Sequence, residues 1–135
     1  MHRQARATIK SFVLLLFLTP LVAQNAPDPH SVPAVDAGLG SCSADFTITD
    51  TAGKPVYAAK INVRVSYGFL NAHKLDLEVG TNIDGKARFS GLPSNLKHGL
   101  FFQASEGDRT GNAFDDPAVK CKADFAVTLR KTTQQ

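Results

Sequence analysis

The stretch "CSADFTITDTAGKPVYAAKINVRV", residues 42–65, alternates apolar and polar side chains on both sides of a turn. Because successive side chains of a strand point to opposite faces, each half of this stretch has one apolar and one polar face. The pattern predicts two half-buried strands, at residues 42–49 and 60–67. Between them, Gly53 permits a tight turn and Pro55 fixes the direction in which the chain leaves it.

The same period of two continues through the rest of the chain. It predicts further strands in "KLDLEVG", "ARFSGLP", "GLFFQAS" and "KCKADFAVTLRK", at residues 74–80, 87–93, 99–105 and 120–131. Residues 106–119 are expected to form a long loop, with at most a brief strand near Phe114. A convincing helical period is absent, so we predict an all-β protein whose two sheets cover each other's apolar faces.

The N-terminus has the pattern of a signal peptide. Three basic residues and no acidic ones precede the apolar run "SFVLLLFLTPLVA", which is short for a membrane span. We therefore expect a signal peptide at residues 1–23, cleaved near Ala23, with an uncleaved membrane anchor as the alternative. Residues 24–41 contain Pro27, Pro29 and Pro33 and are expected to be a flexible Pro-rich spacer, and residues 132–135 a disordered tail.

The charge of the chain changes once this leader is set aside. The whole sequence has 15 Lys+Arg against 12 Asp+Glu, and Arg3, Arg6 and Lys10 all lie in the leader. The remainder is close to neutral. The basic character of the full sequence therefore gives no support for nucleic-acid binding.

Two segments in order carry a family resemblance. "FTITDTAGKPVYAAKINVRV", residues 46–65, and "TNIDGKARFSGLP", residues 81–93, resemble the carboxypeptidase regulatory-like domain. The resemblance implies a Greek-key β-sandwich of about seven strands over residues 42–131, related to transthyretin and to the collagen-adhesin B-type repeats. The matching positions are mostly turn and core residues, so they bear on fold more than on function.

One octapeptide pattern occurs twice, as "CSADFTIT" at residues 42–49 and "CKADFAVT" at residues 121–128. In the family that the chain resembles, the first and last strands lie side by side and parallel. The resemblance therefore implies that Cys42 meets Cys121, that Phe46 stacks on Phe125, and that a disulfide clasps the two strands. A pair of free thiols, a metal site and chance similarity remain the alternatives.

Catalytic motifs are not recognisable in this sequence. Intradiol dioxygenases have a related sandwich and bind iron with two Tyr and two His, and Tyr57, Tyr67, His73 and His98 match that count but not the paired His spacing. The C-terminal signature of the hydroxyisourate hydrolases is also absent. We therefore expect no enzyme activity, no cofactor and no metal.

An acidic segment is the candidate binding loop. Its residues are Glu106, Asp108, Asn112, Asp115 and Asp116. Calcium prefers such oxygen-rich loops, but the spacing matches no EF-hand and Arg109 sits among the acids, so a solvated loop is the favoured interpretation.

These features lead to one expectation about function. The chain is expected to be a secreted or periplasmic, bacterial envelope module without catalytic activity, which binds or scaffolds an envelope or secreted protein. Binding of a small ligand or glycan, or a metal-dependent activity, is the alternative. A membrane is expected to meet the chain only through its signal peptide before cleavage.

Overall fold

A computed structural model describes residues 14–20 and 26–132 of the protein. The predicted signal peptide and its cleavage site fall largely outside these residues, and residues 14–20 form no helix or strand. Within the described part, no helix is long and apolar enough to cross a membrane. The elements are β1 (Ala34–Asp36), β2 (Cys42–Thr49), β3 (Lys60–Tyr67), a 3₁₀ turn (Phe69–Asn71), β4 (His73–Gly80), β5 (Lys86–Leu92), β6 (Leu100–Glu106), β7 (Arg109–Asp115), β8 (Lys122–Thr128) and β9 (Arg130–Lys131).

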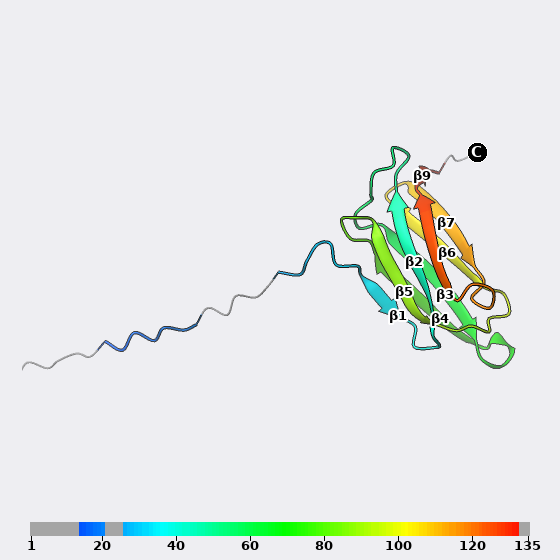
Figure 1. Cartoon of the computed structure of the whole chain (residues 1–135), viewed down its shortest axis with the longest axis horizontal. Helices are drawn as coiled ribbons and strands as arrows, with labels where there is room; N and C mark the ends of the chain where they lie inside the picture. Colours follow the sequence, from blue (N-terminus) through cyan, green and yellow to red (C-terminus); the bar gives the residue numbers. More distant parts are fainter. Residues whose placement is uncertain (1–13, 21–25, 133–135) are drawn as a thin grey trace, which may run out of the picture.

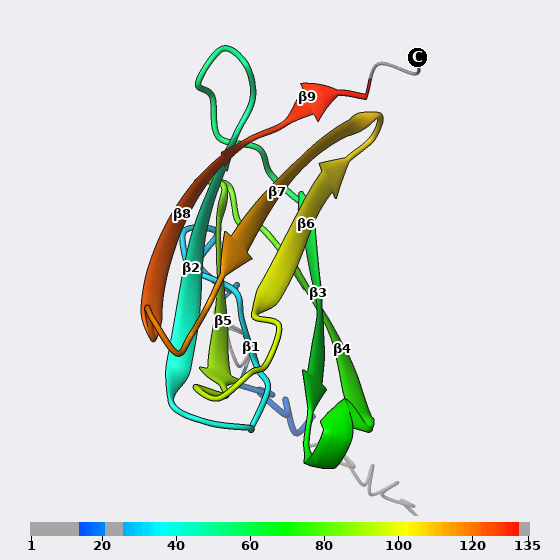
Figure 2. The same cartoon turned by 90° about the vertical axis from the view of Figure 1, so that its right-hand side faces the viewer.

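The strands form two sheets that pack face to face, which confirms the prediction of an all-β sandwich (Figures 1 and 2). One sheet has the order β1-β5-β2-β8 and the other the order β4-β3-β6-β7-β9. The structure has nine strands where about seven were expected. Part of the difference arises at Leu129, which is fully buried and carries the chain from β8 in one sheet to β9 in the other.

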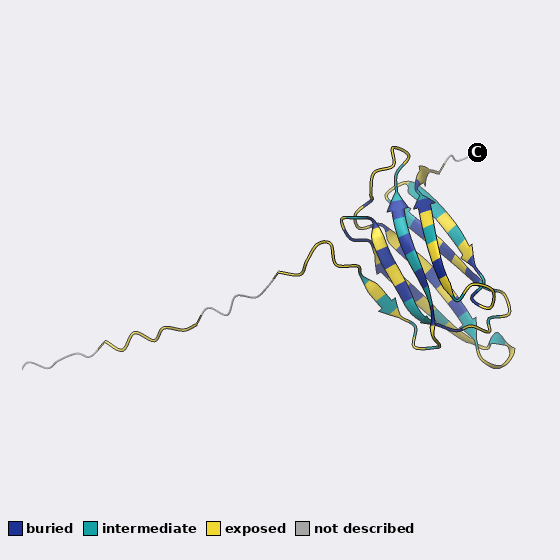
Figure 3. Cartoon of the chain, in the orientation of Figure 1, coloured by how far each residue is buried: buried dark blue, intermediate teal, exposed yellow. Residues whose placement is uncertain are grey.

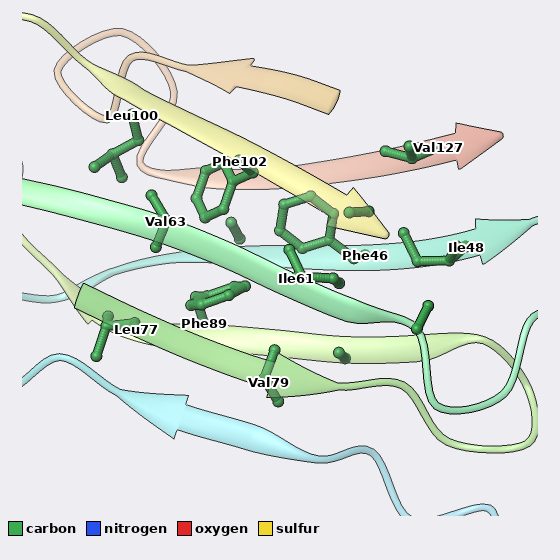
Figure 4. Close-up of a cluster of buried hydrophobic side chains, with 14 of the residues drawn as sticks. Phe46, Ile48, Ile61, Val63, Leu77, Val79, Phe89, Leu100, Phe102 and Val127 are labelled. Carbon is green, nitrogen blue, oxygen red and sulfur yellow. The ribbon is translucent and has the colours of Figure 1, made fainter. Parts of the chain in front are cut away.

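The core lies between the two sheets and is rich in aromatic rings. Alternate residues of β2 and of most of β3 are buried, which gives these strands the banded colouring of Figure 3. Phe46, Phe89 and Phe102 meet at its centre, with ring centroids 4.8 Å apart for Phe46–Phe102 and 5.1 Å apart for Phe89–Phe102 (Figure 4). Aromatic rings in protein cores commonly pack at such separations. The period-two pattern therefore predicted correctly that these three phenylalanines point into the core.

The two octapeptides lie side by side, as the family resemblance implied. β2 and β8 pair in parallel, with Ala44 opposite Ala123 and Phe46 opposite Phe125. The rings of Phe46 and Phe125 stack, with centroids 5.2 Å apart and planes inclined by 29°. The repetition in sequence is therefore a repetition in space, in which equivalent residues of the first and last long strands are neighbours.

The expectation of a flexible spacer at residues 24–41 is wrong for the part nearest the sandwich, which we call the N-terminal arm (residues 28–41). β1 lies in this arm and pairs in parallel with β5, and the amide of Leu39 donates to the carbonyl of Gly91 at 2.8 Å. The physical reason is a short run of alternating apolar residues. Val35, Ala37 and Leu39 are partly buried against the core, so they hold the arm on the sheet despite the prolines before them.

Residues 106–119 also differ from the predicted long loop. β6 and β7 form a hairpin that is paired from Glu106–Arg109 to Leu100–Asp115. The turn consists of Gly107 and Asp108, and Gly107 has a φ of 59°, a left-handed conformation that hairpin turns require and that glycine adopts readily. The strand was hidden in the sequence because β7, "RTGNAFD", has few apolar residues.

Candidate functional site

The outer surface of the five-stranded sheet carries a hollow and two exposed phenylalanines, so it is the candidate binding face. β3 buries Ile61 and Val63 in the core, and β6 buries Phe102. Because side chains alternate along a strand, the sequence neighbours of these residues point outward. No other strand of the described chain covers this surface. We call it the open face and define it by the exposed residues Asn62, Arg64, Asp76, Glu78, Phe101, Gln103, Asn112 and Phe114.

Three amide side chains form a row across the open face. Asn62 of β3 is opposite Gln103 of β6, and Gln103 is opposite Asn112 of β7. Glu78 of β4 lies beside Asn62 and extends the row by one strand. Neighbouring strands are about 4.8 Å apart, so this row presents amide donors and acceptors at a regular spacing.

Two phenylalanines lie next to the amide row. Phe101 and Phe114 are directly opposite each other on β6 and β7, and their residues are 57% and 60% exposed. The ring of Phe114 lies over Gly99, where an added Cβ would come within 2.7 Å of it. Gly99 therefore leaves room for this ring, and the pair forms an apolar area beside polar groups.

A shallow hollow of about 340 Å³ lies on this face. Arg64, Asp76, Phe101 and Gln103 are among the residues that line it. Arg64 donates two hydrogen bonds to Asp76, at 2.7 and 3.0 Å. These hydrogen bonds from Arg64 lower the pKa of Asp76 and raise the pKa of Arg64. The pair is charge-neutral as a unit, and Glu78 adds a carboxylate to the lining of the hollow, which offers both polar and apolar contacts.

The predicted disulfide is present. Cys42 and Cys121 are joined, with Cα atoms 4.6 Å apart, where β2 begins and just before β8. The described chain has no free cysteine. Cys42 is 1% exposed and Cys121 is partly buried against the core, so the bond is a clasp between two strands rather than a surface thiol site. A disulfide is compatible with an extracellular or periplasmic location.

The acidic residues predicted as one binding loop are spread over a hairpin instead. Glu106 is the last residue of β6 and pairs with Arg109, whereas Asp108 is in the turn and 3.8 Å from Lys131. Asn112 points to the open face, and Asp115 is at the far end of β7. Because the hairpin separates them, they do not form a common ligand set. Among the described residues, no three His, Cys, Asp or Glu side chains are placed to hold a metal ion.

The burial of Asp115 is a feature that the sequence did not reveal. Asp115 is 4% exposed, and its Oδ2 has no hydrogen-bond partner in the described structure. Burial raises the pKa of this carboxyl group, and the nearby charge of Asp116 raises it further. Buried carboxylates are normally paired, so this one lowers the stability of the folded chain whenever it is ionised.

The tyrosines and histidines considered as an iron set are not brought together as a group. Tyr67 and His73 stack at the ends of β3 and β4, with centroids 5.3 Å apart. Tyr57 precedes β3 and His98 precedes β6. Tyr57 and Tyr67 are therefore at opposite ends of the eight-residue strand β3.

No family model and no curated protein matches the sequence. Solved structures with a similar strand arrangement include 3-chlorocatechol 1,2-dioxygenase from Rhodococcus opacus, with 13% identity over 85% of this chain and 71% of that one and a TM-score of 0.48. Catechol 1,2-dioxygenase from Acinetobacter radioresistens has 15% identity over 78% of this chain and 60% of that one, with a TM-score of 0.46. Hydroxyquinol 1,2-dioxygenase from Pseudomonas putida has 11% identity over 76% and 63%, with a TM-score of 0.46.

These neighbours correct one expectation. All three are enzymes, which contradicts the expectation from the sequence that the chain is not an enzyme, and we do not retain it. The chain spans 60–71% of the length of these enzymes. At such identities the similarity concerns the arrangement of strands and assigns no activity, substrate or metal to this chain.

Proposed function

We propose that the protein is an exported binding module of the carboxypeptidase regulatory-like type, which binds an envelope or secreted protein through its open face. One observation supports this above all. Phe101 and Phe114 lie side by side, more than half exposed, beside the hollow that Arg64 and Asp76 line. Exposed aromatic side chains next to an arginine are the composition that protein interfaces favour. The apolar leader and the buried disulfide support export.

Cross-linking in the native host tests this proposal. A tagged wild-type copy is compared with Phe101→Ser/Phe114→Ser and with Tyr57→Ser, a control at an aromatic residue that is 66% exposed outside the open face. We expect one protein to be enriched with the wild type and with Tyr57→Ser, and lost with the double variant. Linked peptides should include residues 100–115. Equal enrichment with both variants, or links confined to the other sheet, would refute the proposal.

Export is tested by the same preparation. Mass spectrometry of the envelope fraction, run without reductant, is expected to give a mature N-terminus close to residue 24 and a linked Cys42–Cys121 peptide. A protein that retains residues 1–23 and stays in the membrane fraction would support the uncleaved anchor instead.

The amide row favours a second candidate, a glycan. Amides both donate and accept hydrogen bonds, as sugar hydroxyls do, and Asn62, Gln103 and Asn112 run in a line beside two aromatic rings. A glycan array distinguishes the candidates. Binding to a saccharide that is lost with Gln103→Ala and kept with Tyr57→Ser would favour the glycan, whereas an empty array together with a captured protein would favour the protein partner.

A further inference from the structure

The connection between β3 and β4 is an exposed apolar turn, which we call the prong (residues 68–72). Phe69 and Leu70 are 85% and 84% exposed. The prong projects beyond the end of the sandwich, at the junction of β3 and β4 in Figures 1 and 2. Two adjacent large apolar side chains in solvent are costly for a monomer, and such features mark sites of interaction.

The backbone of the prong is strained. Gly68, Leu70 and Asn71 have φ values of 81°, 55° and 53°. Leucine adopts this left-handed region rarely, and the conformation is unfavourable by about 1 kcal/mol or more. At the base, the ring of His73 stacks on Tyr67, and a Cβ on Gly68 would come within 2.6 Å of the His73 ring. The fold therefore maintains a strained turn that presents Phe69 and Leu70 outward.

Lysines are the permanently charged side chains of the two segments that line the hollow beside the prong. Neither "SYGFLNAHK", residues 66–74, nor "SNLKHG", residues 94–99, contains an acidic residue. Both lysines of these segments, Lys74 and Lys97, are exposed, and Lys97 lines a hollow of about 350 Å³ together with Gly68, Leu70, Asn71 and Asn95. The next acid along β4, Asp76, is held by Arg64 on the open face.

From this arrangement we propose that the prong docks the protein on an anionic lipid surface. Phe69 and Leu70 enter the interfacial layer of the bilayer, and Lys74 and Lys97 face the phosphate groups around them. An apolar tip flanked by lysines combines the two terms that hold a protein at such a surface, namely burial of apolar area and attraction to anionic headgroups. This contact is separate from the open face, and it departs from the expectation that the chain meets a membrane only through its leader.

The sequence offers a clean probe of this contact because it contains no tryptophan. Phe69→Trp places the sole indole on the prong. Tyr57→Trp is the matched control, because Tyr57 is also exposed and precedes β3, whereas the prong follows it. The full chain of each variant is mixed with phosphatidylglycerol vesicles or with phosphatidylcholine vesicles. A leader that is still attached acts equally on both variants, so the difference between the two probes reports on the prong.

We expect the emission of Phe69→Trp to shift to the blue in phosphatidylglycerol vesicles and to be quenched by brominated lipid, with little change for Tyr57→Trp. Adding Lys74→Gln and Lys97→Gln should weaken binding about 25-fold, at about fivefold per lysine. Circular dichroism confirms that each variant is folded. Unchanged emission from folded Phe69→Trp would overturn the proposal, and so would equal quenching at both positions. A shift seen only with a captured protein partner would assign the prong to that partner instead.

Discussion

The side chain of Asn82 ties down the main chain at His30, 52 residues earlier in the sequence, through a hydrogen bond of 3.1 Å from Nδ2 to the His30 carbonyl. The same Nδ2 donates to the carbonyl of Ser31, and Oδ1 accepts from the amides of Asp84 and Lys86. One buried amide therefore organises the turn between β4 and β5 and fastens the N-terminal arm to it.

We expect Asn82→Ala to release the arm. With four hydrogen bonds lost at about 1 kcal/mol each, the free energy of unfolding should fall by about 3–4 kcal/mol. Hydrogen exchange gives the local readout. The amides of Ala37 and Leu39, which bond to Ser90 and Gly91, should lose protection while those of β2 and β8 keep it. The exposed Asn95→Ala is the control, and an arm that stays protected in Asn82→Ala would contradict this role.

Removal of the disulfide should have a large effect on stability. Cys42 and Cys121 are 79 residues apart in sequence. Closing a loop of that size restricts the unfolded chain by about 4–5 kcal/mol in the chain-entropy model. We expect Cys42→Ala/Cys121→Ala to lose about this much in urea denaturation. Reductant should destabilise the wild type similarly and leave the double variant unchanged, and a double variant as stable as the oxidised protein would disprove the clasp.

Alanine substitutions at two turn glycines should distinguish the effect of backbone strain on stability from the effect of a steric clash. Gly53 and Gly85 have φ values of 78° and 72°. An added Cβ meets nothing within 4 Å at Gly53 but comes within 2.3 Å of the Ile48 carbonyl oxygen at Gly85. We expect Gly53→Ala to destabilise by about 1 kcal/mol from strain alone. Gly85→Ala should cost clearly more, because backbone must move, and equal losses in thermal unfolding would show that the turn adapts.

The neighbouring phenylalanines of β6 have opposite roles. Phe102 is 1% exposed and contacts the rings of Phe46 and Phe89, whereas Phe101 is 57% exposed on the open face. We expect Phe102→Ala to lower the free energy of unfolding by about 3–5 kcal/mol. Phe101→Ala should lower it by less than about 1 kcal/mol. Denaturant titration of both variants checks this, and a large loss at Phe101 would mean that the open face serves stability rather than binding.

Asp115 should make stability depend on pH. Burial raises its pKa above the ordinary 3.8. Just above that pH the folded chain keeps a proton that the unfolded chain has released, so the free energy of unfolding falls as pH rises through the raised pKa. Asp115→Asn cannot ionise and should lack this fall. Its stability relative to the wild type is therefore expected to increase with pH from about 4 upward, and parallel profiles would exclude ionisation of Asp115 as the cause.

The sequence predicts the long, regular strands well. The expected bounds of β2 and β3, residues 42–49 and 60–67, match the structure because both strands bury most of one face and are followed by turn residues. The family resemblance also implied the parallel neighbours Phe46 and Phe125, which local pattern alone does not give. Pairing between strands far apart in sequence depends on topology, and alternation says nothing about it.

The remaining features depend on tertiary context. β1 has only three residues, too few to show a period, and it forms a strand because it pairs with β5. β7 lacks an apolar face because Gly111 there approaches β8 so closely that a Cβ would lie 2.6 Å from Val127. The open face has one local signal that was missed. Phe101 and Phe102 are adjacent in a strand, so one of them has to point away from the core.

The parallel pairing of β2 with β8 has a consequence for how the chain folds as it is made. β2 obtains its neighbour β8 only when residues 122–128 are available, so a ribosome that still holds these residues also holds back completion of this sheet. Contacts of such long sequence separation slow folding, and sandwiches dominated by them fold in milliseconds to seconds. The first sheet is therefore completed last, and the Cys42–Cys121 bond can form only after the two ends of the domain have met.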